Sequence, residues 1–284
     1  MIAVDLDGTL LNGAGRISVA NLQAIIAAQS AGVLVIPSTG RSWRESRQVL
    51  ASFPLPDGSQ PGVFVSGAAI SDLTTGKTHD MSVIEPNLAM QVVEHLRDLP
   101  EAVLVFRDAE LAGHDYMVTG QGILTANTQW WFQETGASVR FVDKPTLDDM
   151  HHTLRVGIVA TAEHARQVGS WIARTMGESI IVQSFEVVQQ PDSMQNVHVL
   201  EIFARGIDKW RGLDWIARQH GIDPSHVAMI GDAVNDLAAI RAAGCGIAMG
   251  NADDQVKAAA DHITTTCNDD GAAHAINQLM AGDW

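Results

Sequence analysis

Residues 1–10 read MIAVDLDGTL, and this stretch decides the fold because two carboxylates stand where a buried strand ends. The apolar start predicts a short strand at Ile2–Leu6, and the Gly-Thr pair after the second carboxylate predicts a turn. Alternation along the extended chain puts Asp5 and Asp7 on a common side. Burial and mutual repulsion disfavour two ionised carboxylates in such a place, so the rest of the chain has to supply positive charge.

Alternating strands and helices continue after the first strand. Short connections between such elements predict a parallel sheet with right-handed crossovers. The next elements are predicted as a helix at 18–31, a strand at 33–37, a helix at 42–50 and a strand at 62–66. The end of the chain repeats the pattern, with strands predicted at 227–230, 246–249 and 262–265 and helices at 208–220, 235–243, 253–260 and 271–280.

The middle of the chain differs from both ends. A crossover needs only about a dozen residues, and this stretch is far longer, so it predicts an inserted α+β domain. We therefore expect a Rossmann-like parallel-sheet core formed by residues 1–72 and 200–284, with residues 73–199 inserted into it. Within and at the edge of the insertion, strands are predicted at 103–107, 154–160, 180–185 and 197–203 and helices at 87–96 and 162–176.

The composition restricts the possible partners. Eighteen Lys and Arg against 33 Asp and Glu give a formal net charge of −15, which argues against nucleic acid and anionic lipid. Cys245 and Cys267 have neither a disulfide framework nor metal-ligand spacing. No apolar run reaches the roughly 20 residues of a membrane span, and the first residues lack a signal-peptide pattern. We expect a cytoplasmic protein with no membrane partner, a monomer or a weak homo-oligomer.

Polar residues collect just past the predicted strands, where parallel α/β sheets bind their ligands. Mg²⁺ favours carboxylate and water oxygens and would relieve the repulsion between clustered carboxylates. With a lysine it would hold a phosphoryl group, to which a hydroxyl and a glycine amide can donate, and an ionised Asp can attack phosphorus. The residues expected to converge are Asp5, Asp7, Ser38, Thr39, Gly40, Arg41, Ser66, Gly67, Lys209, Asp232, Asn235 and Asp236.

Four ordered motifs resemble those of the haloacid dehalogenase superfamily. They are DLDGT at 5–9, STGR at 38–41, Lys209 at a helix start and GDAVND at 231–236. The tail GDAVNDLAAIRAAGCGIAMGNADDQVKAAADHIT is similar to the Cof-type branch of sugar-phosphate phosphatases. The insertion between the second and third motifs matches the larger α+β cap of that branch in position, length and class. The resemblance itself covers the two core segments, a little over half of the chain.

The resemblance implies a role for each motif residue. Asp5 would be the nucleophile that forms an aspartyl-phosphate and would also ligate Mg²⁺. Asp7 would be the general acid and then the general base, with its backbone carbonyl on the metal. Asp232 would be a metal ligand, and Asp236 would orient Lys209 or a metal-bound water. The phosphoryl group and substrate would be contacted by the Leu6 amide, Thr39, Gly40, Arg41, Ser66, Lys209 and Asn235.

Two residues depart from the pattern of the branch. Ser66 precedes Gly67 where the branch usually has Asn, and Asp208 precedes Lys209 where it usually has Ser or a similar residue. Neither change removes a catalytic group. We therefore expect a Mg²⁺-dependent phosphatase for a small phosphorylated metabolite such as a sugar phosphate. A phosphomutase of the same superfamily is one alternative, and a non-catalytic phosphate-sensing module is another, although the intact carboxylates and lysine argue against the latter.

Overall fold

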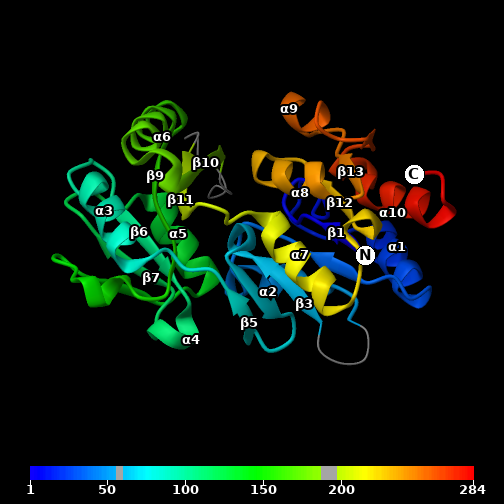
Figure 1. The fold of residues 1–284 in the computed structure, drawn as a ribbon, viewed down its shortest axis with the longest axis horizontal. Coiled ribbons are helices and arrows are strands. Elements are labelled where there is room, and N and C mark those ends of the chain that lie inside the picture. The colour runs from blue at the N-terminus through cyan, green and yellow to red at the C-terminus, as the bar shows by residue number, and fades with distance from the viewer. Residues whose placement is uncertain (56–59, 187–196) are drawn as a thin grey trace. The chain divides into compact units, whose positions relative to one another are not determined.

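The computed structural model describes residues 1–55, 60–186 and 197–284, and the chain divides into two compact units (Figure 1). The first, here called the core unit, contains Met1–Asp80 and Asp208–Trp284, and the second, the inserted unit, contains Met81–Ile207. Every residue predicted for the site lies in the core unit. The predicted site residues therefore belong to a single compact unit.

The core unit is built on a parallel sheet, as predicted, and this sheet has five strands. Its strand order is β14-β13-β12-β1-β2. Strand β1 lies between β12 and β2 and pairs Val4 with Ile230 on one side and with Pro37 on the other, so three strand ends lie at one level. The strands are β1 (Ile2–Val4), β2 (Val35–Pro37), β12 (Ala228–Gly231), β13 (Cys245–Ala248) and β14 (His262–Ile263).

Helices of the core unit begin at side-chain caps that the sequence contains. Ser18, Ser42 and Asp208 each accept a hydrogen bond from a backbone amide in the first turn of the helix that follows. Helices α1 and α10 pack together, as Figure 1 shows at the two ends of the colour scale. The helices are α1 (Val19–Ser30), α2 (Trp43–Leu50), α7 (Lys209–Gln219), α8 (Leu237–Ala242), α9 (Asp254–Lys257) and α10 (Gly271–Ala281), and the 3₁₀ turns are η1 (Val65–Gly67), η4 (Pro224–His226), η5 (Val234–Asp236) and η6 (Cys267–Asp269).

The third predicted strand does not join the parallel sheet, which corrects the expectation of one continuous sheet. It pairs antiparallel with the next strand in a small sheet of order β3-β4-β5, and among the described residues its bridge to the large sheet is the parallel one between Ser38 and Val63. Pro37 has no amide hydrogen to donate toward β3, so pairing begins with the Thr39 amide, 2.8 Å from the Val63 carbonyl. The strands are β3 (Pro61–Phe64), β4 (Ala69–Asp72) and β5 (Thr78–Met81).

The inserted unit has the predicted α+β class. Its six-stranded sheet has the order β10-β11-β9-β6-β7-β8 and is antiparallel except between β7 and β8. Helices α3 and α6 contribute buried apolar residues to one cluster with this sheet. The strands are β6 (Val103–Arg107), β7 (Tyr116–Thr119), β8 (Val139–Phe141), β9 (Thr153–Thr161), β10 (Ile180–Glu186) and β11 (Val197–Ala204). The helices are α3 (Pro86–Leu96), α4 (Ala109–Ala112), α5 (Ala126–Thr135) and α6 (Ala162–Met176), with 3₁₀ turns η2 (Leu147–Met150) and η3 (Gly177–Ser179).

Strand pairing moves both boundaries between the units away from the positions expected at 72/73 and 199/200. Strand β5 pairs with β4, so the hairpin around residues 73–77 stays with the core unit. Strand β11 pairs with β10 from His198 to the end of the strand at Ala204, so the expected second boundary falls inside a strand of the inserted unit. In the described part of the chain, no helix has the length and apolar character required to cross a membrane.

Candidate active site

A buried lysine joins two of the predicted carboxylates in the core unit. Asp5 follows β1, where its amide donates to the Ile230 carbonyl at 3.0 Å, and Lys209 is the first residue of α7. The Lys209 side chain is fully buried, and its Nζ lies 2.5 Å from Asp5 Oδ1 and 2.6 Å from Asp236 Oδ1. The sheet and the start of α7 thus bring together residues more than two hundred positions apart in sequence.

The protonation of this group follows from burial and charge. Burial alone would lower the pKa of Lys209, but Asp236 and Asp5 more than offset it and hold that pKa above its usual value. Burial raises the pKa of Asp5 well above 3.8; Lys209 opposes the rise, and neighbouring carboxylates reinforce it. Burial, and then the charge of Asp236, raise the pKa of Asp232 to about 7. One ammonium therefore leaves the group with excess negative charge, which favours a bound cation.

Three of these carboxylates have the geometry of a metal site. Asp5, Asp232 and Asp236 each offer an oxygen, and the three oxygens lie within 4.8 Å of one another. Oxygen donors and surplus negative charge fit Mg²⁺. Asp236 already accepts hydrogen bonds from Lys209 and, at 3.0 Å each, from the amides of Asp232 and Ala233. These bonds leave Asp5 and Asp232 as the side chains better placed to ligate a metal, with Asp236 supporting them.

Asp7 lies in a different environment from Asp5. Its side chain is 46% exposed, whereas the Asp5 side chain is 6% exposed. Both carboxylate oxygens of Asp7 pair with the guanidinium of Arg41, with Nε 2.7 Å from Oδ2. Burial lowers the pKa of Arg41, but the charge and hydrogen bonds of Asp7, together with the charges of Glu45 and Asp5, outweigh it, so the net change is upward. The two carboxylates of the opening motif are thus separated into one beside Lys209 and one beside Arg41.

The turn after β2 carries the predicted phosphoryl contacts and holds the segment that follows β3. Thr39 Oγ1 accepts a hydrogen bond from the Arg41 amide at 3.1 Å, which closes a tight turn around Gly40. The Ser66 amide donates to the Thr39 carbonyl at 3.0 Å, and the Val65 amide donates to the Arg41 carbonyl at 2.9 Å. These bonds set Ser66 beside the Thr39–Arg41 turn.

Several buried polar atoms near these turns have no hydrogen-bond partner among the described residues. They include Ser38 Oγ, Ser66 Oγ and Asn235 Oδ1. Buried polar atoms are usually paired, so such a group marks a place where water or a ligand completes the hydrogen bonds. Leu6, by contrast, has a fully buried apolar side chain that anchors the segment between the two carboxylates.

The turn after β3 has an unusual backbone. Val65, Ser66 and Gly67 have φ values of 51°, 52° and 97°, and a β-branched residue rarely adopts such a conformation. A Cβ on Gly67 would lie 1.8 Å from the carbonyl oxygen of Asp208, which caps α7. Glycine at this position therefore lets the turn approach the residue directly before Lys209.

Two further polar residues hold Asp232 and were missed in the sequence. Thr9 Oγ1 donates to Asp232 Oδ1 at 3.1 Å, and Asn251 Nδ2 lies 2.8 Å from the Gly8 carbonyl and 3.4 Å from Asp232 Oδ2. Asn251 follows the predicted strand 246–249 at the same edge of the sheet. Extending the list of strand-end residues to that strand would have found it.

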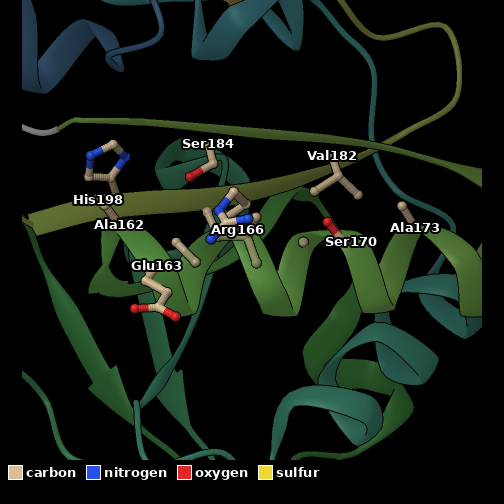
Figure 2. Close-up of a pocket in the computed structure, with 11 residues that line it drawn as sticks. Ala162, Glu163, Arg166, Ser170, Ala173, Val182, Ser184 and His198 are labelled. Carbon is tan, nitrogen blue, oxygen red and sulfur yellow. The ribbon is translucent and has the colours of Figure 1, made fainter.

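A hollow lies in the inserted unit between α6 and strands β10 and β11 (Figure 2). Arg166 and Ser170 from α6, Ser184 from β10 and His198 from β11 line it together with small apolar residues. Glu163 is the one acidic residue of the lining, and Figure 2 shows its carboxylate pointing away from the strands. Without an acidic cluster, this hollow lacks the chemistry of the core-unit site.

Comparison with known proteins agrees with the geometry of the core unit. A family model described as haloacid dehalogenase-like hydrolase matches residues 2–276. The chain belongs to the haloacid dehalogenase-like hydrolase family. The sequence resemblance to this superfamily, and to its Cof-type branch, is thereby confirmed.

Relatives of this haloacid dehalogenase-like hydrolase cover its whole length. Two from Bacillus subtilis are the 5-amino-6-(5-phospho-D-ribitylamino)uracil phosphatases YcsE, 30% identical over 99% of this chain and 95% of the relative, and YitU, 28% identical over 99% and 97%. A solved haloacid dehalogenase-like hydrolase from Bacteroides thetaiotaomicron is 26% identical, with a TM-score of 0.75 over 98% of both chains. The predicted enzyme class, a phosphoric monoester hydrolase, is confirmed.

Proposed function

We propose that this enzyme is a Mg²⁺-dependent phosphatase that hydrolyses a small phosphomonoester through an aspartyl-phosphate on Asp5. The observation that carries the proposal is the buried Asp5 carboxylate, 2.5 Å from the Lys209 ammonium and grouped with Asp232. The ammonium offsets negative charge where a phosphate would approach, and a carboxylate kept ionised can attack phosphorus. A structural ion pair would not need the further carboxylates around it.

The two carboxylates of the opening motif divide the proton chemistry. Asp5 attacks phosphorus, the bond from phosphorus to the leaving oxygen breaks, and Asp7 donates the proton that the leaving alcohol requires. Asp7 then takes a proton from water as the water attacks the aspartyl-phosphate, which releases inorganic phosphate and frees Asp5. Lys209 stays protonated throughout because it lies between two carboxylates.

Asp5, Asp232 and the backbone carbonyl of Asp7 would hold Mg²⁺, which supplies Lewis-acid stabilisation and a template for phosphate when bound. Near the phosphoryl group, the partnerless Ser66 hydroxyl is available to donate a hydrogen bond, whereas the partnerless Asn235 Oδ1 can accept one from water or from a substrate hydroxyl. The Leu6 amide, the Thr39 hydroxyl and the Gly40 amide are the proposed donors. Arg41 orients Asp7 and lies on the substrate side.

The proposed substrate is a small phosphorylated metabolite of the sugar-phosphate or polyol-phosphate class. Two relatives are phosphatases whose named substrate carries a phosphorylated ribityl chain, which supports this class. The net charge of −15 argues against nucleic acid and membrane partners. A monomer or weak homo-oligomer in the cytoplasm remains the proposal for the working form, with the inserted unit, residues 81–207, as the cap that selects the substrate.

A screen of phosphomonoesters tests the function. Inorganic phosphate is measured with Mg²⁺ and with EDTA, and sugar-phosphate products are separated to detect a phosphomutase. We expect metal-dependent phosphate release that Asp5→Asn lowers by at least about 10³-fold. Asp283→Asn, a change of the same chemistry at an exposed position near the C-terminus, is expected to keep full activity. Undiminished turnover by Asp5→Asn would exclude the nucleophile, and isomerised sugar phosphate without phosphate release would favour the phosphomutase.

A further inference from the structure

The carboxylate of Asp232 is held at both of its oxygens by neutral donors. Thr9 Oγ1 donates to Oδ1 at 3.1 Å, and Asn251 Nδ2 lies 3.4 Å from Oδ2. A positively charged side chain in place of Thr9 or Asn251 would compete with a metal for this carboxylate. The hydroxyl and the amide instead orient the carboxylate without neutralising its charge. Asn251 belongs to none of the four motifs that define the site.

The side chain of Asn251 connects three segments of the core unit. Its Oδ1 accepts from the Cys267 amide at 2.8 Å, and its Nδ2 donates to the Gly8 carbonyl at 2.8 Å while facing Asp232. With the amide flipped, Oδ1 would face the Gly8 carbonyl and the Asp232 carboxylate, both of which are acceptors. Only the present orientation therefore satisfies all three partners. The backbone nearby is also tied to Asp232, whose carbonyl accepts from the Asp253 amide at 3.2 Å.

The contact between Gly8 and Asp232 is too close for any other residue in the Gly8 position. A Cβ on Gly8 would lie 2.1 Å from Asp232 Oδ2, and Gly8 has a φ of 72°. Asn251 bridges the two sides of this contact because one amide group reaches the Gly8 carbonyl and the Asp232 carboxylate. Asn251 also donates to the Gly8 carbonyl. This bond keeps the Gly8 carbonyl from competing with the neighbouring Asp7 carbonyl as a metal ligand.

We propose that Asn251 is a positioning residue that fixes the Asp232 carboxylate and the Gly8 loop in the arrangement required for binding a divalent cation. The inference rests on the metal site of the proposed function and adds to it a residue outside the motifs. Outer residues that orient metal ligands typically change metal affinity by about 10–100-fold when removed. Asn251 acts on the metal through Asp232 and Gly8, so its loss should weaken binding more than it slows the chemical step.

Mn²⁺ binding to the full chain, followed by electron paramagnetic resonance without substrate, tests the proposal independently of turnover. We expect Asn251→Ala to weaken Mn²⁺ binding by about 10-fold or more. Asn251→Gln keeps the amide but is one methylene longer, so it cannot keep all three contacts. Its Mn²⁺ affinity should lie between those of the wild type and Asn251→Ala. Asn268→Ala is the matched control. Asn268 Oδ1 accepts from the Gly13 amide at 2.8 Å, so it also links the segment after β1 to the segment around Cys267, but no hydrogen bond joins it to Asp232 among the described residues.

The outcomes separate this inference from the function on which it rests. Absence of Mn²⁺ binding by the unaltered protein would overturn the metal site itself. Wild-type affinity in a folded Asn251→Ala, or in Asn251→Gln if the alanine variant does not fold, would overturn the role of Asn251 alone. In steady-state assays, the Mg²⁺ concentration for half-activation should rise with the Mn²⁺ dissociation constant, while kcat at saturating Mg²⁺ stays within about threefold of wild type. An equal loss in Asn268→Ala would also contradict the proposal.

Discussion

Arg41 binds both carboxylate oxygens of Asp7, with its Nε 2.7 Å from Oδ2 and a second guanidinium nitrogen on Oδ1. A two-point contact of this kind fixes the plane of the carboxylate as well as its position. In the proposed mechanism, Asp7 delivers a proton to the leaving alcohol and later accepts one from water, so at least one of its oxygens is released from the guanidinium during the cycle. The pair therefore orients Asp7 before reaction and has to loosen as the substrate is bound.

Removing the guanidinium should slow the enzyme by leaving Asp7, whose side chain is 46% exposed, without its orienting partner. For Arg41→Ala we expect kcat to fall by about 10–100-fold, less than the roughly 10²–10⁴-fold that a positioned acid–base group supplies, because Asp7 itself is kept. Arg41→Lys keeps the charge but not the two-point geometry and should recover only part of the loss. Steady-state kinetics on the best substrate measure this, with Arg47→Ala on the exposed face of α2 as control; equal effects of both variants would contradict it.

The separate environments of Asp5 and Asp7 predict a trapped intermediate. In Asp7→Asn the proposed nucleophile, Asp5, and Lys209 are intact, so transfer to Asp5 can proceed with an activated leaving group, but the attacking water has lost its proposed base. We expect aspartyl-phosphate to accumulate when an activated ester such as p-nitrophenyl phosphate is used. Acid-quenched protein should then carry one added phosphoryl group by intact-mass spectrometry. Turnover at the wild-type rate, with no added mass, would remove Asp7 from the acid–base role.

Lys209 should be as important for folding as for chemistry. Lys209→Met leaves Asp5 and Asp236 buried without their counterion, and removing one partner of a buried pair typically costs about 3–5 kcal/mol of unfolding free energy. The raised pKa of Asp5 means that acid neutralises part of the unpaired charge. The destabilisation, measured by urea unfolding in EDTA, should therefore be smaller at pH 5 than at pH 8. A loss that is independent of pH would contradict this explanation.

Local sequence patterns and the topology of a parallel sheet predict the fold and most of the residues that form the candidate site. Parallel strands end at one edge, so Asp5 and Asp232 had to lie near each other, and the cap at Asp208 located the start of α7 and with it Lys209. The pairing of Arg41 with Asp7 depends on how the Thr39–Arg41 turn closes, which residue spacing does not encode.

Non-local pairing explains the other differences between the expectations and the fold. The missing amide of Pro37 separates β3 from the parallel sheet, although the sequence at 62–66 reads as an ordinary buried strand. The strand predicted at 197–203 crosses the boundary expected at 199/200, and its pairing with β10 and β9 assigns the whole strand to the inserted unit. Such partners are chosen by the folded sheet rather than by the segment itself.

The raised pKa of Asp232 gives the metal-free protein a defined pH dependence. Its pKa is about 7 in the folded state against 3.8 for an ordinary Asp, so between these values the folded state binds more protons than the unfolded state. Stability should therefore fall as pH rises from about 4 to about 7. We expect the Tm in EDTA to drop over this range and Mg²⁺ to restore it at pH 8. Asp232→Asn should reduce both the drop and the Mg²⁺ effect; an unchanged slope would argue against Asp232 as its source.

Gly67 brings the turn after β3 against the start of α7. Because of this contact, adding one methyl group with Gly67→Ala should lower the activity. A Cβ there would lie 1.8 Å from the Asp208 carbonyl oxygen, in addition to the cost of a φ of 97° for a non-glycine residue. Relief requires moving the turn or the first residue of α7, which is Lys209. Gly67→Ala should therefore lower kcat/KM by about 100-fold, since small misplacements at a reacting centre have effects of this size.

Gly32 provides the matched comparison for this effect, because its φ is 83° and no atom lies within 4 Å of the position its Cβ would take. Gly32→Ala carries the conformational cost of about 1–2 kcal/mol without the clash. Both variants should lose stability in thermal unfolding, but only Gly67→Ala should lose activity per folded molecule. If the two variants keep equal kcat/KM values, the turn after β3 does not position Lys209, and the approach of Gly67 to Asp208 serves packing alone.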